Sequence, residues 1–492
     1  MRCLIRFAVI PLLLASFSSL HAEKPKRMTE KDYLELIIEV TKPLKHKRGG
    51  RLPLYVWASR INSISDEEEI ERLLKALDER GIAVLASWGN PKGIEQALRV
   101  GKIQKKLGLM VNVDATGAVY SFCDGSEETA HVDKAGKRFF DMSFAGYRKM
   151  GCPFALKQRY EPMRQKLEPF LKGYKEAGVP MDFWAADWEI DGPIEWNDAW
   201  KNSKNCTRCQ ANIENIDNFK NFQNALRRIR SHMQNEVFCK TIKKFFPKAL
   251  IGNYGANPHG GHRYWYDYFE KEVKPDLGYP GQKDQNAFYR TWAHEFEGAG
   301  YTYAMPVVYT WYQIFNWYPE FENTDYRWFY NLLLVGSNVG KHTPKDIPII
   351  PFVHWHTTAA PKEGVPGLVD MSENAYKELL WHLLLRGHDT LIMWCPRNEL
   401  ADEVRPLQEV YADSLEFAKF LENGKPVIFD VPKKQGAVVS AVRLKNQLLV
   451  RRTDFGDAPR IVKIEIDGKM ARIPRTNGKC KIIKLEKSRD RK

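Results

Sequence analysis

The sequence predicts an α/β fold of the (β/α)8 TIM-barrel class, followed by a small all-β, sandwich-like domain. Eight short apolar runs, each followed by a helical pattern, alternate between residues 54 and 421. After Gly424 the pattern changes to short alternating runs separated by Asn, Asp and Gly turns. We therefore expect a leader at residues 1–22, a barrel at 23–424 and a β domain at 425–492.

The first residues have the layout of a secretory signal peptide. Arg2 and Arg6 form a basic start, residues 7–14 are apolar, and polar residues follow Ala22. The apolar run is shorter than the roughly 20 residues that span a membrane, and no later segment supplies such a run. We expect cleavage near Ala22, a secreted or periplasmic mature protein, and no transmembrane segment.

The predicted strands of the barrel are rich in β-branched and aromatic residues. They lie at residues 54–57, 82–88, 109–114, 182–189, 249–254, 301–309, 347–354 and 389–394. A capping box formed by Ser65 and Glu68 predicts the start of the helix after the first strand. An open doubly wound sheet is the alternative, but no Gly-rich phosphate loop follows the first strand.

Positive charge is concentrated in the C-terminal domain. The 492-residue chain has 75 Lys and Arg against 61 Asp and Glu, a formal charge of +14, and residues 425–492 hold 19 basic and 7 acidic residues. All 14 Trp lie between Trp57 and Trp394. We expect the basic domain to contact a polyanionic glycan or the cell envelope, with a solvated basic face as the alternative. Expected export argues against a nucleic-acid partner.

Two carboxylates end the fourth predicted strand. Asp187 and Glu189 are two residues apart and share a strand face, so both are expected at the barrel mouth. Two carboxyl groups held this close cannot easily both lose their protons, so the pKa of one of them is raised and that group can act as a general acid. Asp191 follows in the same segment and is a substrate-binding candidate. The alternative is an acidic pair bonded to a loop arginine or a helix N-terminus.

The other strand ends separate two mechanisms. Strands six, seven and eight end without Asp or Glu, and Asp114, ending strand three, is the plausible distant partner. Acids gathered on one strand suit substrate-assisted hydrolysis, in which the sugar's 2-acetamido oxygen attacks the anomeric carbon. A two-carboxylate mechanism pairing Glu189 with Asp114 stays open.

Polar and aromatic side chains at other strand ends suit a sugar ligand, because indole faces stack on pyranose rings. About half of the six tryptophans at or just beyond predicted strand ends are expected to be structural. These six are Trp57, Trp88, Trp188, Trp311, Trp355 and Trp394. His354 and His356 share a strand face and are expected either to orient a substrate or a carboxylate, or to be structural. The substrate-binding candidates besides the acids are Asn253, Tyr254, Tyr309, Trp311, His354 and Trp394.

Cysteines indicate little chemistry. Seven remain after the leader, an odd number that cannot all pair within one chain. Cys206 and Cys209 have the spacing of half a zinc motif, but a second such pair is missing. We expect a local disulfide or free thiols here, no metal and no cofactor.

Short motifs resemble those of the hyaluronidase family and its chitinase-like relatives. The matching segments are residues 187–189, Met305 to Tyr309, and 379–394, which ends in Leu-Ile-Met-Trp. The resemblance implies a TIM barrel that acts on N-acetylhexosamine glycosides. It implies Glu189 as proton donor, Asp187 as the group orienting the acetamide, and Tyr309 and Trp394 as walls of the sugar site.

The sequence thus predicts an exported glycoside hydrolase that cleaves a polysaccharide, acidic or containing N-acetylhexosamine. Glu189 is expected as general acid and Asp187 as its assistant in a substrate-assisted, retaining mechanism. The alternative from another class is a non-catalytic secreted glycan-binding protein.

Overall fold

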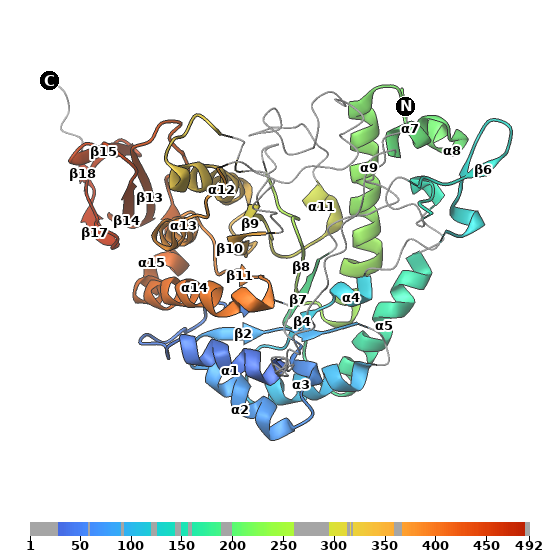
Figure 1. Cartoon of the computed structure of the whole chain (residues 1–492), viewed down its shortest axis with the longest axis horizontal. Helices are drawn as coiled ribbons and strands as arrows, with labels where there is room; N and C mark the ends of the chain where they lie inside the picture. Colours follow the sequence, from blue (N-terminus) through green and yellow to red (C-terminus); the bar gives the residue numbers. More distant parts are fainter. Residues whose placement is uncertain are drawn as a thin grey trace, which may run out of the picture.

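The computed structural model describes residues 28–57, 60–89, 93–119, 125–142, 149–155, 160–187, 199–259, 295–311, 315, 318–358 and 367–487. Within these ranges, parallel strands surrounded by helices form a large unit, which we call the parallel-strand unit (Figure 1). Antiparallel strands near the C-terminus form a second, smaller unit, the C-terminal β unit. The predicted mixed α/β class is confirmed.

The parallel strands form two sheets. The first has the order β2-β1-β11-β10-β9, with strands Ile82–Val84, Leu54–Val56, Ile392–Met393, Phe352–Thr358 and Val307–Trp311. The second has the order β3-β4-β7-β8, with strands Ala86–Ser87, Asn112–Asp114, Phe183–Ala186 and Leu250–Asn253. Each apolar run predicted as a strand overlaps at least one of these, although β9 and β10 begin and end later than predicted. β1 pairs with β11, so the first and last parallel strands are neighbours, as a ring requires and an open doubly wound order does not allow.

The two sheets meet on both sides without forming one closed ladder among the described residues. β2 and β3 are separated only by Leu85, where the chain bends from one sheet to the other. On the other side, the N–H of Thr302 donates to the carbonyl of Ile251 in β8 at 2.9 Å. The N–H of Ile251 donates to Oγ1 of Thr302 at 2.7 Å. Because a side chain replaces a backbone carbonyl there, the regular pairing stops.

Aromatic rings fill the space between the sheets. Tyr55 of β1 stacks on Phe183 of β7 with ring centroids 4.1 Å apart, and Phe183 stacks on Tyr303 at 5.0 Å. Gly252 of β8 makes room for this stack, because a Cβ atom at this position would lie 2.3 Å from the Tyr303 ring. The interior is therefore a packed core.

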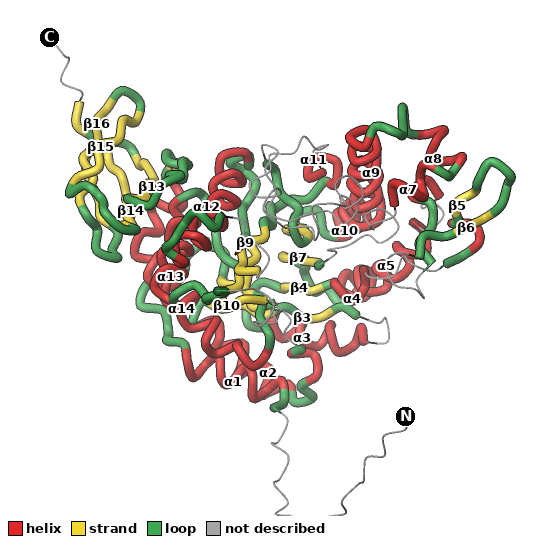
Figure 2. The backbone as a smooth tube through the Cα atoms, turned by 45° about the horizontal axis from the view of Figure 1, so that its top comes forward, coloured by secondary structure: helices red, strands yellow, loops and turns green. Residues whose placement is uncertain are grey.

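Helices cover the outside of the sheets (Figure 2). They include α1 (Glu30–Val40), α2 (Glu67–Asp78), α3 (Ile94–Lys106), α5 (Tyr160–Glu176), α9 (Phe219–Gln234), α12 (Thr324–His342), α13 (Glu373–Leu385) and α14 (Leu400–Ser414). The sequence analysis did not predict α1. It also placed the N-cap of α2 one residue early, because Asp66, rather than Ser65, accepts from the N–H groups of Glu68 and Glu69.

The C-terminal β unit consists of two antiparallel sheets over one small core. One sheet is β12-β13-β14-β17, with strands Lys425–Pro426, Ala437–Leu444, Gln447–Asp454 and Lys481–Lys484. The other is β15-β16-β18, with strands Ile461–Ile466, Lys469–Pro474 and Glu486–Lys487. Val439, Leu448 and Val450 of the first sheet pack with Ala471 and Ile473 of the second. β16 was not predicted from the sequence.

The C-terminal β unit packs against α12, α13 and the short α15 (Ala418–Asn423), as Figure 1 shows. Arg386, directly after α13, is fully buried and donates to the carbonyls of Phe429, Asp430 and Val439. His382 of α13 forms a 2.7 Å hydrogen bond with the Ser440 hydroxyl. The two units therefore share a polar, buried contact. No helix in the described ranges is long and apolar enough to cross a membrane.

Candidate active site

Two candidate carboxylates lie at the carboxyl ends of adjacent parallel strands. Asp114 ends β4 and is paired with Ala185 of β7, and Asp187 follows β7 directly. Thr116 connects them: its N–H donates to Oδ1 of Asp114 at 2.9 Å, and its Oγ1 accepts from the N–H of Asp187 at 2.9 Å. The fold therefore brings both aspartates to one section of the rim, as the sequence analysis expected of strand ends.

The environment of Asp114 favours its protonated form. The residue is 7% exposed, and this burial raises the pKa of the carboxyl group although the hydrogen bond from Thr116 opposes the change. Desolvation of the charged form is the cause.

The other two acids selected from the sequence, Glu189 and Asp191, lie outside the described residues, and so does Trp188. The predicted pairing of Asp187 with Glu189 on one strand face therefore stays a prediction. β7 itself ends at Ala186, one residue before the first of these acids.

Two tyrosines from neighbouring strand ends meet beside the aspartates. Tyr254 follows β8 and Tyr309 lies in β9, and their hydroxyl groups form a hydrogen bond. The N–H of Tyr254 donates to the carbonyl of Ala186 at 2.9 Å, which fixes this residue next to the end of β7. Asn253, whose side chain is buried, is paired with Ala186 in the sheet. Asn253, Tyr254 and Tyr309 thus lie on the same rim as Asp187.

A buried carboxylate that the sequence analysis did not select holds the end of β10. Oε1 of Glu403, in the first turn of α14, lies 3.1 Å from Nδ1 of His354 and 2.8 Å from Nδ1 of His356. Its oxygens also accept from the N–H groups of Trp355 and His356 at 2.8 and 2.7 Å. Both histidines thus contact one buried carboxylate, and their expected role in orienting a substrate or a catalytic carboxylate stays a prediction.

These contacts set the charge of Glu403 and the orientation of His354. Burial raises the pKa of Glu403, but the hydrogen bonds from His354 and His356 outweigh burial and hold it at about 2. The hydrogen bond with Glu403 raises the pKa of His356. His354 itself is fully buried beside this carboxylate.

Trp394 and Tyr309 flank the His354 ring edge to face, with centroids 5.5 and 6.1 Å away. Trp394 is half-buried, and Trp311, at the end of β9, is 8% exposed. The remaining predicted sugar-stacking tryptophans that the structure describes have structural contacts. Trp57 packs on Phe352, Trp88 stacks on Phe170 with no exposed surface, and Trp355 donates to the carbonyl of Met371.

The group formed by His354, Glu399 and Glu403 is a poor candidate for a metal centre. Ligand atoms of His354, Glu399 and Glu403 lie within 4.8 Å of one another. However, the oxygens of Glu403 already accept from two backbone N–H groups and His356, and they lie close to His354. The group is therefore better described as a hydrogen-bonded carboxylate. A cleft of about 360 Å³ that includes Ile349 and Asp389 lies at the amino ends of β10 and β11, opposite these residues.

Comparisons with known proteins find similar structures only. No family model matches the chain, and no curated protein does, so membership in the hyaluronidase family is not shown. Among solved structures, alpha-L-fucosidase isoenzyme 2 from Paenibacillus thiaminolyticus is 10% identical with a TM-score of 0.44, over 77% of this chain and 51% of its own. The chain thus spans about half the length of that protein.

Two further structures have similar scores. Amy13B from Eubacterium rectale is 9% identical with a TM-score of 0.44, over 85% of this chain and 89% of its own. A GH36 alpha-galactosidase from Geobacillus stearothermophilus is 10% identical with a TM-score of 0.39, over 93% of this chain and 58% of its own. All three TM-scores lie below 0.5, and the comparisons assign the chain no family.

Proposed function

We propose that this chain is an exported glycoside hydrolase that cleaves a polysaccharide at the carboxyl-end rim of a closed (β/α)8 barrel. One observation carries the proposal: Thr116 joins Asp114 and Asp187 on a rim that also holds the Tyr254–Tyr309 pair. Carboxyl groups with different environments, beside hydroxyl donors and a half-buried indole, are what glycoside hydrolysis requires. The proposed substrate is acidic or contains N-acetylhexosamine.

In the proposed mechanism, Glu189 protonates the glycosidic oxygen while the substrate's acetamide oxygen attacks the anomeric carbon. Asp187 orients the acetamide group and stabilises the positive charge that develops on it. The leaving sugar takes the proton from Glu189, and Glu189 then accepts a proton from the water that opens the cyclic intermediate. In this mechanism Tyr309, whose hydroxyl contacts that of Tyr254, donates to the acetamide oxygen.

The second candidate is a two-carboxylate mechanism that pairs Glu189 with Asp114. The burial of Asp114 beside Asp187 favours it, because Asp114 is a carboxyl group with a raised pKa on the same rim. A secreted glycan-binding protein without activity is the alternative of another class. It would use the same aromatic rim and release no new reducing ends.

The test is release of reducing ends from a panel of neutral, acidic and N-acetylhexosamine polysaccharides. Active protein and a loss of at least a hundredfold in kcat for Glu189→Gln are expected. Glu161→Gln, on the exposed side of α5, is the matched control and keeps full activity. Full activity of Glu189→Gln contradicts both mechanisms, and binding without cleavage of any polysaccharide supports the glycan-binding alternative.

A further inference from the structure

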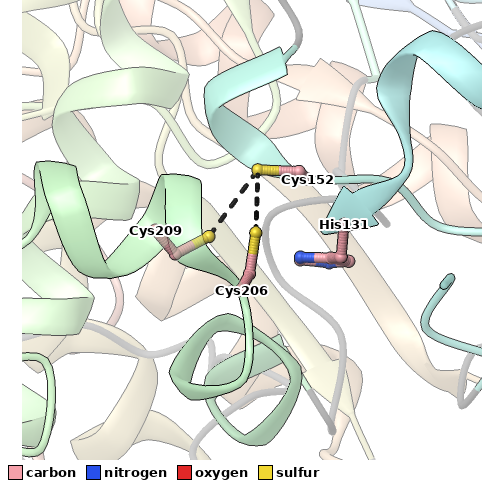
Figure 3. A group of neighbouring side chains, drawn as sticks. All are labelled: His131, Cys152, Cys206 and Cys209. Carbon is pink, nitrogen blue, oxygen red and sulfur yellow. Dashed lines mark hydrogen bonds between the residues drawn. The ribbon is translucent and has the colours of Figure 1, made fainter. Parts of the chain in front are cut away.

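Four buried metal-ligating side chains meet in the segments that follow β4 and β7. They are His131, Cys152, Cys206 and Cys209, and their ligand atoms all lie within 4.8 Å of one another (Figure 3). Each is at most 2% exposed. Because free thiols and an imidazole rarely gather in a core without a ligand, the cluster calls for a chemical explanation.

The sulfur positions fit a tetrahedral ion. Sγ of Cys152 lies 3.7 Å from Sγ of Cys209 and 3.8 Å from Sγ of Cys206. Two thiolates bound to zinc at about 2.3 Å and the tetrahedral angle have sulfurs about 3.8 Å apart. A disulfide would require about 2.0 Å, and all three cysteines are free. The distances therefore match shared coordination and exclude a formed disulfide.

The polar groups of the cluster lack ordinary partners. Nδ1 of His131 is buried and has no hydrogen-bond partner in the described part of the chain. The three sulfurs instead lie against one another, because the Cys152 sulfur is in contact with those of both Cys206 and Cys209. A bound dication would give all four side chains a common partner.

Bonds outside the cluster hold its two halves together. The strand with His131 is β5 (His131–Val132), and Cys209 lies in α8 (Thr207–Asn212). Oγ1 of Thr207 donates to the carbonyl of Val132 at 3.1 Å, and Nη1 of Arg208 donates to that of Ala130 at 2.9 Å. The second sheet strand of the hairpin, β6 (Arg138–Phe139), supplies Phe139, which stacks on the His131 ring at 5.0 Å.

The backbone at Cys152 is equally constrained. Its N–H donates to the carbonyl of Thr129 at 2.7 Å. A Cβ atom on the preceding Gly151 would lie 2.4 Å from that carbonyl oxygen, so only glycine permits this approach. The ligands are thus fixed by the protein fold, which is the arrangement of a preformed site.

We propose that His131, Cys152, Cys206 and Cys209 form a structural zinc site. Three thiolates and one imidazole are a standard zinc ligand set, and four protein ligands leave no open position for catalysis. β5 follows β4, which ends at Asp114, and α8 follows β7, after which Asp187 lies. β5 and α8 are neighbours (Figure 2), and the proposed site joins them. Zinc therefore stabilises two connections that border the candidate active site. The inference does not depend on the proposed hydrolase function.

The first experiment measures metal in full-length protein purified without a metal-affinity tag and without chelator. About one zinc ion per chain is expected by elemental mass spectrometry. Cobalt exchanged into the same protein is expected to show sulfur-to-metal charge-transfer bands and strong visible bands of tetrahedral geometry. Protein without metal after incubation with zinc, or a disulfide between any two of the three cysteines, overturns the proposal.

Variants locate the ion. Cys206→Ser and Cys152→Ser are expected to lose at least nine-tenths of the zinc, whereas His131→Cys, which supplies a fourth thiolate, keeps it. Cys239→Ser, at a buried free cysteine in another segment, is the matched control and keeps it as well. Zinc retained in both Cys206→Ser and Cys152→Ser places the ion elsewhere and rejects the site. If these variants do not fold, the cobalt spectrum of the wild-type chain still decides.

Discussion

Arg451 of β14 forms a buried two-bond ion pair with Glu378 of α13. Nε of the arginine donates to Oε2 at 2.9 Å, and Nη2 donates to Oε1 at 2.6 Å. The Thr453 hydroxyl donates to the same carboxylate. The pair lies at the contact between the parallel-strand unit and the C-terminal β unit, so this contact contains two buried opposite charges.

Removal of the charge on Glu378 is expected to destabilise the protein strongly. Glu378→Gln leaves Arg451 buried without a counter-ion, which costs about 3 kcal/mol of unfolding free energy. Urea denaturation measures the loss. Asp467→Asn breaks the exposed pair with Arg443 and is expected to cost less than about 1 kcal/mol. Equal losses in the two variants contradict the role of the buried pair.

The contact between Glu403 and His356 is expected to make the stability of the protein fall at both low and high pH. The pKa of Glu403 is lowered to about 2, so its contribution to stability is present above its ordinary pKa of 4.5 and is lost as the pH falls toward 2. The pKa of His356 is raised from 6.5, so its contribution is complete below 6.5 and is lost as the pH rises through the raised value. Urea titrations of Glu403→Gln are expected to lose both slopes, and unchanged slopes contradict the assignment.

Asp114 and Asp187 distinguish the two hydrolytic mechanisms. Substrate-assisted hydrolysis predicts that Asp187→Asn lowers kcat at least a hundredfold and that Asp114→Asn lowers it less than about tenfold. The two-carboxylate mechanism predicts a loss of at least a hundredfold for Asp114→Asn. Steady-state kinetics on the polysaccharide that the panel identifies separates these outcomes, and near-normal kinetics in both variants contradicts a role for this rim.

The tyrosine pair is expected to act on substrate and not on folding. Tyr309→Phe and Tyr254→Phe are each expected to lower kcat/KM about tenfold, since one hydrogen bond stabilises a bound state by about 1.4 kcal/mol. Tyr411→Phe is the control, because this buried tyrosine donates to the carbonyl of Leu52 before β1, away from the rim. The rim is not the binding site if all three variants behave alike.

The proposed glycan contact of the C-terminal β unit is best tested at its exposed lysines. Lys481→Glu with Lys484→Glu reverses two charges on β17 and is expected to weaken retention on a polyanionic resin at low salt only. Removal of the whole unit is a poor test, because Arg386 and Glu378 would lose their partners. Unchanged retention of the double variant rejects the contact.

The strands of the parallel unit were predictable because each is a short apolar run bounded by turn residues. β16 was missed because lysine and arginine alternate with its apolar residues after the tight turn at Asp467 and Gly468, both with positive φ. The rim residues could be selected from the sequence, because functional residues are expected at strand ends. Glu403 could not be selected in this way, because it belongs to a helix and reaches the rim only through its contact with β10.

The cluster of His131 and the three cysteines could not be predicted from the sequence either. Cys206 and Cys209 form a recognisable pair, but Cys152 and His131 are far from them in sequence. No spacing rule links the four residues, because the connection is made by the packing of the β5–β6 hairpin against α8. Of the two expectations for this pair, a local disulfide or free thiols, the structure shows free thiols, and it adds contacts with Cys152 that the sequence did not predict.

The buried contact of Arg386 also determines the order in which the chain can mature during synthesis. Its carbonyl acceptors lie at residues 429–439, so a ribosome that has finished α13 has not yet supplied them. Until they emerge, docking α13 on the core would enclose cations and a carboxylate without partners, which is unfavourable. Stable docking of α13 is therefore expected only once residues 429–439 have been made, and chains that end before them are expected to lack this contact.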